Sequence, residues 1–362
     1  MQKSLCQTFV ATLLTLSVFT GNVRANEIEL VAKLPSKTPP GNIALSSDNR
    51  IFLSVHGFYD QPVKVVELLQ DGSTRPYPTQ EWAYPPANDQ NEIGLYGVLG
   101  INADSNGVLW MLDTSSQERA GRLIGWDMRA EQLQRVIYLA KPVITDRSFL
   151  NDFAIDLKNN AIYVADTGTE AIIVVNLSTG QAWRVLEGSE FTKAQNLDMV
   201  IDEKLIEMDG QPARLGVNPI TIDSQNDYLY WGAMSGRAIY RIKTKYLNNP
   251  QLTDSELITH IEHYGEKPIS DGITIDDAGN VYITSITDDS IGVVQPDGTY
   301  KTLFQDDTLS WPDGFAVGPD NYIYVTINEL HRSPVLNDGQ NQSKGEFKVM
   351  RFKAISTAQT GR

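Results

Sequence analysis

The sequence predicts an all-β fold, a single-domain six-bladed β-propeller with a short helix and a long loop insertion. The first observation is a repeated pattern, in which a polar residue, a short alternating apolar run and a turn rich in Asp, Asn and Gly precede an aromatic-containing strand. The second is its number, five clear copies and a weaker sixth. The third is its spacing of about 40 to 70 residues, which suits a four-stranded blade.

Each copy of the pattern indicates two strands of period two joined by a tight turn. A β-sandwich would also contain many short strands, but it would not repeat the same polar start around the chain. The five clear copies begin at Gly41, Asn151, Asn218, Asp271 and Asp313, and the weaker copy begins at Leu99.

The first 25 residues are predicted to be a secretory signal peptide. Lys3 precedes an apolar run over residues 9–19, and the small-residue site ends at Ala25. The run is too short to span a bilayer, and the alternative is an ordinary buried N-terminal helix. We therefore expect an extracellular or periplasmic protein without membrane insertion. The only cysteine, Cys6, lies in this segment, so the mature chain would have neither disulfide nor thiolate chemistry.

The remaining chain divides into propeller, insertions and tail. We expect the propeller over residues 26–355, with a strand over residues 27–32 completing the last blade. The polar, acidic segment 188–215 is predicted to be an insertion, and the capping start and helical spacing of residues 253–264 predict a short helix. Residues 356–362 are expected to fray.

The charge balance limits the partners. Forty-five acidic against 30 basic residues give a net charge of −15, which argues against nucleic acid and against an anionic membrane surface. It suits a small, neutral or cationic partner. No sequence feature identifies a protein partner.

The first polar position of each repeat is expected to face the central channel, where the inner strands of a propeller begin. Two carboxylates and several amide oxygens on one axis suit a hard cation such as calcium rather than zinc. The alternative is that these residues cap turns without a ligand. They are Asn151, Asn218, Asp271 and Asp313, with Asn42 one position out of register.

Two histidines follow the second strands of blades that are adjacent in a closed ring, namely His56 in the first and His331 in the last. They could flank one pocket and move protons, or they could be structural. Trp311 lies near the same loops and could provide an aromatic wall for a flat organic ligand.

Four stretches resemble the signature segments of the yellow and major royal jelly protein family. They are residues 99–113, 150–185, 215–244 and 309–332, and the similarity covers about residues 30 to 353. The absence of the cysteines typical of insect members favours the microbial branch. The resemblance implies a secreted six-bladed propeller with an axial ligand channel, in a family whose insect members act on melanin precursors or bind aromatic amines.

A more distant similarity links the chain to the calcium-dependent gluconolactonases, also called senescence marker proteins. It implies Asn218 and Asp271 as metal ligands and Asn151 at the metal or substrate. The glutamate that these proteins carry in blade one is replaced by Gly41 and Asn42, and their sugar-contacting arginine is replaced by Phe149. An apolar or aromatic ligand is therefore favoured over a sugar lactone.

Three functions follow as expectations. The first is a secreted propeller that binds, and in one version converts, a small aromatic molecule, with His56 or His331 moving protons. The second is a lactonase in which one calcium ion polarises the carbonyl and Asp271 or Asp313 helps water to attack, and the third is a non-catalytic scaffold. The catalytic candidates are thus Asp271, His56 and His331. The ligand-binding candidates are Asn42, Phe149, Asn151, Trp311 and Asp313, and the metal candidates are Asn218, Asp271 and Asn151.

Overall fold

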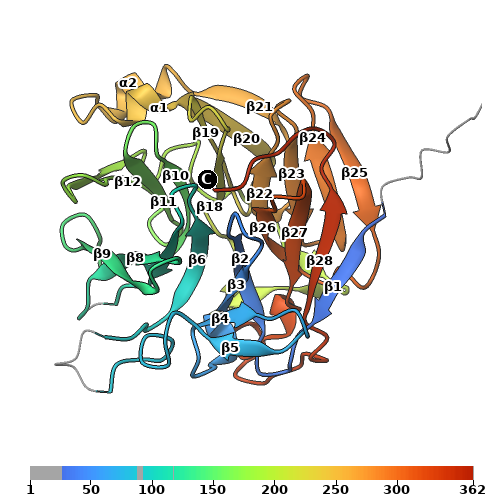
Figure 1. The fold of residues 1–362 in the computed structure, drawn as a ribbon. Helices are drawn as coiled ribbons and strands as arrows, with labels where there is room; N and C mark the ends of the chain where they lie inside the picture. Colours follow the sequence, from blue (N-terminus) through green and yellow to red (C-terminus); the bar gives the residue numbers. More distant parts are fainter. Residues whose placement is uncertain (1–26, 88–92, 117, 362) are drawn as a thin grey trace, which may run out of the picture.

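Six four-stranded antiparallel sheets surround a central axis, which confirms the predicted six-bladed β-propeller (Figure 1). The computed structural model describes residues 27–87, 93–116 and 118–361. The predicted signal peptide lies outside the described residues. All six repeat windows form the first two strands of a blade, including the weak one that begins at Leu99.

The first three blades use consecutive strands from the inside outwards. They are β2–β5 (Pro40–Leu45, Ile51–Val55, Val65–Leu68, Thr74–Pro76), β6–β9 (Val98–Ala103, Val108–Asp113, Gly121–Asp127, Gln132–Leu139) and β10–β13 (Leu150–Asp156, Ala161–Asp166, Ala171–Asn176, Ala182–Val185).

The fourth and fifth blades follow the same order, whereas the sixth borrows a strand from the beginning of the chain. They are β18–β21 (Val217–Ile222, Tyr228–Ala233, Ala238–Lys243, Glu262–Glu266), β22–β25 (Ser270–Ile275, Val281–Ser285, Ser290–Val294, Tyr300–Gln305) and β26–β27–β28–β1 (Pro312–Val317, Tyr322–Ile327, Lys348–Lys353, Glu29–Lys33).

The ring is closed by strand β1, which pairs antiparallel with β28 and completes blade six. Leu30 faces Met350 and Lys33 faces Lys348 in this register. The sequence prediction of a closing N-terminal strand is confirmed.

The hydrophobic core lies between the blades. Each of six apolar clusters joins two neighbouring sheets, so that the middle strands are buried on both faces. This explains why strands such as β12, with the sequence AIIVVN, are nearly continuous apolar runs rather than strict alternations. Burial of both faces provides the main stabilisation of a chain of this kind.

Each inner strand carries a β-bulge at the start of its repeat window. In β10, for example, Leu150 pairs with Asp166 and Phe153 with Val164, so two residues oppose one on the neighbouring strand. The same shift occurs in all six inner strands. A bulge redirects side chains locally, and here it decides which residues face the axis.

The predicted helix is shorter than expected. Helix α2 covers Asp254–Ile258, and Thr253 caps it in a reciprocal capping box with Glu256. Residues beyond it form β21, because the chain must supply an outer strand for blade four. A second short helix, α1, covers Thr244–Leu247.

The predicted insertion folds into two small hairpins. They are β14–β15 (Val200–Ile201 with Lys204–Leu205) and β16–β17 (Glu207–Met208 with Gln211–Pro212). The turn of each hairpin consists of two residues with positive φ, as a type I′ turn requires. In the second hairpin these residues are Asp209 and Gly210. We call residues 188–215 the lid. Its apolar residues join the cluster between blades one and six.

The C-terminal segment differs from the frayed tail that we expected. The amide of Ser356 donates to Asp276 at 3.1 Å, and the amide of Ala358 donates to Asn321 at 2.7 Å. The Thr357 carbonyl accepts from the Asp277 amide at 2.7 Å. These contacts tie the segment to turns of blades five and six, and it ends near the centre of the ring (Figure 1).

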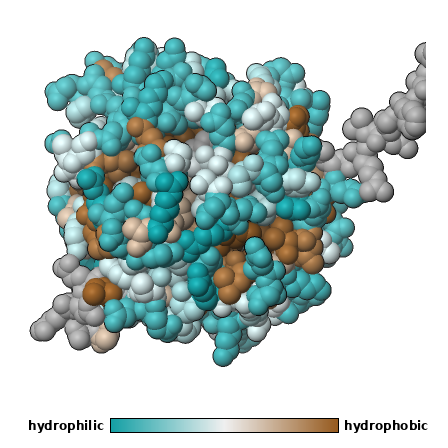
Figure 2. All heavy atoms as spheres, in the orientation of Figure 1, coloured by the Kyte–Doolittle hydropathy of each residue, from teal (hydrophilic) through white to brown (hydrophobic). Residues whose placement is uncertain are grey.

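The face on which this segment lies is mostly hydrophilic, with apolar side chains in separate patches (Figure 2). Among the described residues, no helix is long and apolar enough to cross a bilayer.

Candidate functional site

The bulges place two successive residues of every inner strand on the axis instead of one. The first position of each window therefore contributes to one axial layer and the second position to the next. The first layer consists of Gly41, Leu99, Asn151, Asn218, Asp271 and Asp313, and the second consists of Asn42, Gly100, Asp152, Pro219, Gly272 and Gly314.

Most second-layer positions carry little or no polar side chain because neighbouring inner strands approach closely there. A Cβ atom on Gly314 would lie 2.2 Å from Oδ1 of Asn42, and one on Gly272 would lie 2.2 Å from the Asp313 carbonyl oxygen. Asn42 and Asp152 fill the space that remains. They join across the channel, where Nδ2 of Asn42 donates to Oδ1 of Asp152 at 3.0 Å.

A cavity of about 300 Å³, the axial cavity, lies on the lid side of this pair. Its wall is mainly apolar, and the lid contributes much of it. The lid residues that line it are Met199, Ile206, Met208, Asp209, Ala213 and Leu215. The blades and the loop after β27 add Phe58, Phe149, Met234, Trp311, Leu330, Val335 and Leu336.

The lid is held to blade six by polar contacts at its first hairpin. Asp202 accepts from the guanidinium of Arg332 at 2.7 Å and lies 3.2 Å from Nε2 of His331. Nζ of Lys204 donates to Asn337 at 2.7 Å. The lid is therefore attached to blade six by these polar contacts, in addition to its buried apolar residues in the core cluster.

Asp271 lies at the floor of the axial cavity and is 8% exposed. Its Oδ1 accepts from Nδ2 of Asn218 at 2.6 Å, and its Oδ2 accepts from Nε1 of Trp311 at 2.7 Å. Burial raises the pKa of Asp271 to about 6, although these donors favour the charged form and oppose the rise.

Two further carboxyl groups share the floor. Asp313 accepts from Nδ2 of Asn328 at 2.6 Å, and Asp152 accepts from Asn42 and from the amide of Phe153. Burial, with repulsion from Asp271, raises the pKa of Asp313 well above its usual range. The same two causes raise the pKa of Asp152 to about 7.

No basic side chain forms an ion pair with any of these three carboxyl groups in the described part of the chain. Lys267 is buried nearby, but its Nζ donates to the carbonyl oxygens of Met234, Gly236 and Pro268. Burial lowers the pKa of Lys267 to about 7. Lys267 acts on Asp271 only through space, so most of the negative charge on the floor is left to be relieved by protons or by a cation that binds there.

The two candidate histidines do not flank one pocket. His56 lines the axial cavity, and its Nδ1 accepts from the amide of Phe58 at 3.2 Å. Burial lowers its pKa to about 3, so it is neutral near pH 7. His331 lies behind Trp311, with the rings 6.1 Å apart and 11° from parallel, and it does not line the cavity.

The aromatic candidates do line the cavity. Phe149 faces Phe58 with ring centroids 6.5 Å apart. Trp311 is 2% exposed and has φ = 53°, a left-handed conformation that is uncommon for a bulky residue and that marks a constrained position.

The residues predicted as calcium ligands are bound to one another or to neighbouring N–H groups in this arrangement. Both oxygens of Asp271 accept N–H groups, and Asn218 uses its amide to hold one of them. Asn151 lines the cavity without adding a carboxylate. Within the described residues, no group of three or more His, Cys, Asp or Glu side chains is arranged to hold a metal ion.

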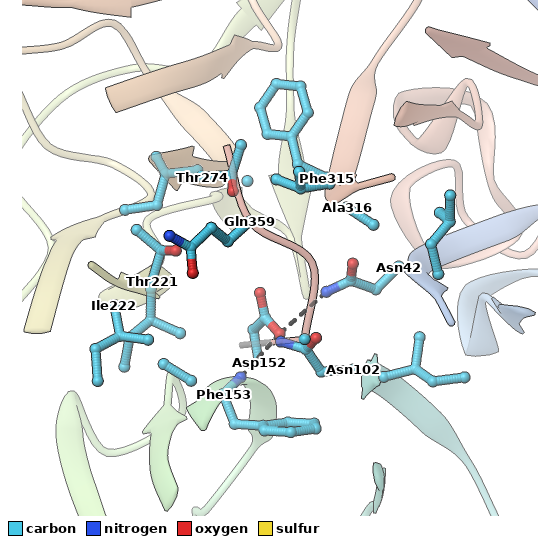
Figure 3. A pocket seen from close by; sticks show the side chains of 18 residues that line it. Asn42, Asn102, Asp152, Phe153, Thr221, Ile222, Thr274, Phe315, Ala316 and Gln359 are labelled. Carbon is cyan, nitrogen blue, oxygen red and sulfur yellow. Dashed lines mark hydrogen bonds between the residues drawn. The ribbon is translucent and has the colours of Figure 1, made fainter. Parts of the chain in front are cut away.

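A second, smaller chamber of about 40 Å³ lies on the other side of the Asn42–Asp152 pair. We call it the tail chamber because the C-terminal segment lines it with Gln359 and Gly361. Its polar side chains include Asn102, Thr221 and Thr274, which point inwards from three different blades (Figure 3).

Sequence reasoning missed Asp152, the lid residues and the tail chamber. A strict alternation that points Asn151 at the axis points Asp152 away from it, and only the bulge reverses this. The adjacent pair Asn151–Asp152 at a repeat start was the one available signal.

The fold and the axial cavity define a six-bladed propeller with a covered axial channel. A model of the major royal jelly protein family matches residues 96–359. The chain belongs to this family. Among curated proteins, no sequence matches the chain.

Solved structures of other propellers share the fold. A luciferin-regenerating enzyme has a TM-score of 0.57 at 12% identity, covering 93% of this chain and 98% of its own. A gluconolactonase from Xanthomonas campestris has a TM-score of 0.53 at 12% sequence identity, and the match covers 91% of this chain and 89% of that chain. Virginiamycin B lyase from Staphylococcus aureus has a TM-score of 0.53 at 13% sequence identity, and the match covers 91% of this chain and 100% of that chain. At these identities the likeness establishes the fold alone.

Proposed function

We propose that the protein binds a small amine with an aromatic body in the axial cavity. One observation carries this proposal, namely three carboxyl groups beneath an otherwise apolar wall, one buried and two half-buried, without an ion-pair partner among the described residues. An ammonium group near Asp271 and Asp313 would supply the missing positive charge, and Phe58 and Phe149 would cover the aromatic ring.

Conversion of the ligand would rest on the carboxyl groups rather than on the histidines. A carboxyl group with a raised pKa can give and take a proton near neutral pH. Asp313 offers one such group, because only its Oδ2 is bound by Asn328. His56, with a pKa of about 3, is a poor base and is not protonated at that pH.

Isothermal titration with phenethylamine, 2-phenylethanol and phenylacetate tests the proposal. These probes share an aromatic body and differ in charge. We expect the amine to bind at least about tenfold more tightly than the alcohol, a difference of about 1.4 kcal/mol, and the acid not to bind. Equal affinity for amine and alcohol would show an apolar binder without a cation site, and no binding by any probe would refute the proposal.

Two variants with the same change in net charge make the test specific. D313N should weaken phenethylamine by about tenfold or more, because it removes a charge that faces the cavity. D307N removes an exposed charge and should leave the affinity within about twofold.

The proposal predicts in which direction the affinity for phenethylamine changes with pH. A cationic ligand favours ionised carboxyl groups, so its affinity should fall as the pH drops through about 6, where Asp271 takes up a proton. An affinity that rises on acidification would contradict the assignment.

A lactonase remains the alternative, supported by the shared fold with a gluconolactonase. The bonds that occupy Asp271 count against a calcium site there. Turnover of gluconolactone that requires calcium and is lost in D271N would replace the amine proposal. A scaffold role would instead predict that none of the small molecules binds.

We also propose that the protein is exported. The predicted signal peptide and the resemblance to secreted family members support this proposal. N-terminal sequencing of the protein from the extracellular or periplasmic fraction should begin at Asn26, and an intact N-terminus in the cytoplasm would contradict it.

A further inference from the structure

The axial cavity reaches the surface at one side of the lid. Among the described residues that line it, only Asp209 and Val335 are exposed. Asp209 lies in the turn of hairpin β16–β17, and Val335 lies in the short 3-10 helix η3 (Pro334–Leu336), against which β16 packs. We propose that ligands enter the cavity at this junction and that Asp209 selects cations there. The selection of amines rests on the proposed function, whereas the position of the entrance does not.

The first argument is that the carboxylate of Asp209 is free. Its side chain forms no hydrogen bond or ion pair with any described residue. Two other exposed acids of the lid differ in this respect, because Asp198 is paired with Arg214 and Asp202 with Arg332. The carboxylate of Asp209 is therefore available to a cation that approaches the cavity.

The second argument is the sign of the charges along the cavity. No lysine or arginine of the described chain lines it. Its charged residues are Asp209 at the exposed edge and three aspartates at the floor, and the wall between them is mainly apolar. A cation is attracted both where it enters and where it binds, whereas an anion is repelled at both places.

The third argument is the uneven attachment of the lid. The polar contacts of Asp202 and Lys204 with blade six belong to the first hairpin. No side chain of residues 207–211, which form the second hairpin, makes a hydrogen bond or ion pair with a described residue. Segments with few contacts open at the lowest cost in free energy. Hairpin β16–β17 can therefore separate from η3 while the first hairpin stays attached.

The alternative is that Asp209 serves the turn alone, since Asp-Gly suits a type I′ turn. Asparagine is equally suited to this position, so D209N keeps the turn and removes only the charge. We expect Tm to be the same in D209N and in the wild-type protein. A change in entry without a change in Tm then separates the two roles.

Modification of a cysteine inside the cavity tests the entrance without a bound amine. Ala213 lines the cavity and is 4% exposed, so A213C in a C6S background places the only thiol behind the proposed entrance. The two reagents are cationic 2-aminoethyl methanethiosulfonate and anionic 2-sulfonatoethyl methanethiosulfonate. Each rate is divided by the rate of the same reagent with free mercaptoethanol. The ionic strength is about 0.1 M, where the Debye length of about 10 Å leaves mainly local charges to act.

We expect D209N to lower the ratio of the cationic to the anionic rate by about threefold or more. E207Q is the matched control, because Glu207 is exposed on the same hairpin and does not line the cavity. It should change the ratio by less than about 1.5-fold. Equal ratios in D209N and E207Q would overturn the role of Asp209.

A bulky side chain at the junction tests the position of the entrance. V335W should slow both reagents several-fold, because the indole fills the space between η3 and the hairpin. L133W adds the same indole at a residue of similar exposure, 43% against 47%, on the outer strand β9, and should leave both rates unchanged. Unchanged rates in V335W would place the entrance elsewhere and overturn the proposal.

Stopped-flow mixing with phenethylamine connects the entrance to the proposed function. D209N should slow association by about threefold and leave dissociation unchanged, because a charge at the rim acts on the entering ligand. E207Q should keep both rates. An effect of D209N on dissociation alone would overturn selection at the entrance. Absence of phenethylamine binding would refute the proposed function, and the result with the A213C thiol would still decide where ligands enter.

Discussion

Nε1 of Trp311 donates to Oδ2 of Asp271 at 2.7 Å, and the ring of Trp311 lies nearly parallel to that of His331, with centroids 6.1 Å apart. His331 in turn contacts Asp202 of the lid at 3.2 Å. A continuous series of contacts therefore links the floor of the axial cavity to its roof. Changes at either end are expected to be detected at the other.

Replacement of Trp311 by phenylalanine tests the first contact. W311F removes the N–H that stabilises ionised Asp271, so the pKa of Asp271 rises further and the loss of phenethylamine binding moves to higher pH. The free energy of unfolding should fall by about 1–3 kcal/mol, as chemical denaturation can measure. W183F is the control, because Nε1 of Trp183 is buried without a partner and its loss should change neither quantity.

Release of the lid is expected to change binding rates more than stability. The Asp202 side chain is 53% exposed, so D202A should cost at most about 1 kcal/mol. Stopped-flow mixing with phenethylamine should show both association and dissociation several-fold faster. D198A breaks the Asp198–Arg214 pair inside the lid at similar exposure and should leave both rates unchanged. Equal effects of the two variants would refute attachment through Asp202.

His56 should affect stability in acid but not ligand binding. Its pKa is about 3 in the folded chain and near 6.5 in the unfolded chain, so the unfolded state binds the extra proton between these values. Stability is then complete above pH 6.5 and falls below it by up to about 1.4 kcal/mol per pH unit. H56N, whose amide oxygen can accept from Phe58, should remove this slope and keep the pH profile of phenethylamine binding. A profile shifted in H56N would return His56 to the catalytic candidates.

Deletion of residues 356–362 tests the role of the C-terminal segment. The change leaves polar groups of Asp276, Asp277 and Asn321 without their partners, so unfolding should require about 1–3 kcal/mol less free energy. The affinity for phenethylamine should not change, because this segment does not line the axial cavity. A frayed segment would instead leave the stability unaltered.

The fold could be predicted from the sequence because every blade needs the same start. The polar residue, the apolar alternation and the Asp- or Asn-rich turn are local requirements. Carboxylates such as Asp104 and Asp276 accept backbone amides of their own turns, at 2.9 Å from Val108 and 3.0 Å from Asn280. The end of the predicted helix was placed too late. The residues that follow Ile258 are needed for β21, the outer strand of blade four, and this requirement cannot be seen in the local sequence.

The candidate site could be predicted only in part. The first axial layer follows from the repeat register, and Asp271, Asp313 and Asn218 lie where they were expected. Asp152 was missed because bulges are not visible in an alternation. The apolar residues of the lid, such as Met208, lie in a polar segment whose partners are distant in sequence, and only the folded ring brings them together.

The pairing of β1 with β28 also sets an order in time. Strand β1 is synthesised first, but it can pair only after β28 of the last blade has been synthesised. Asp313 reaches its place beside blade one at the same moment, because its neighbour Gly314 then packs against Asn42. A chain whose translation stops before β28 would therefore lack a closed axial channel as well as a complete sixth blade. We expect such products to be recognised as unfolded.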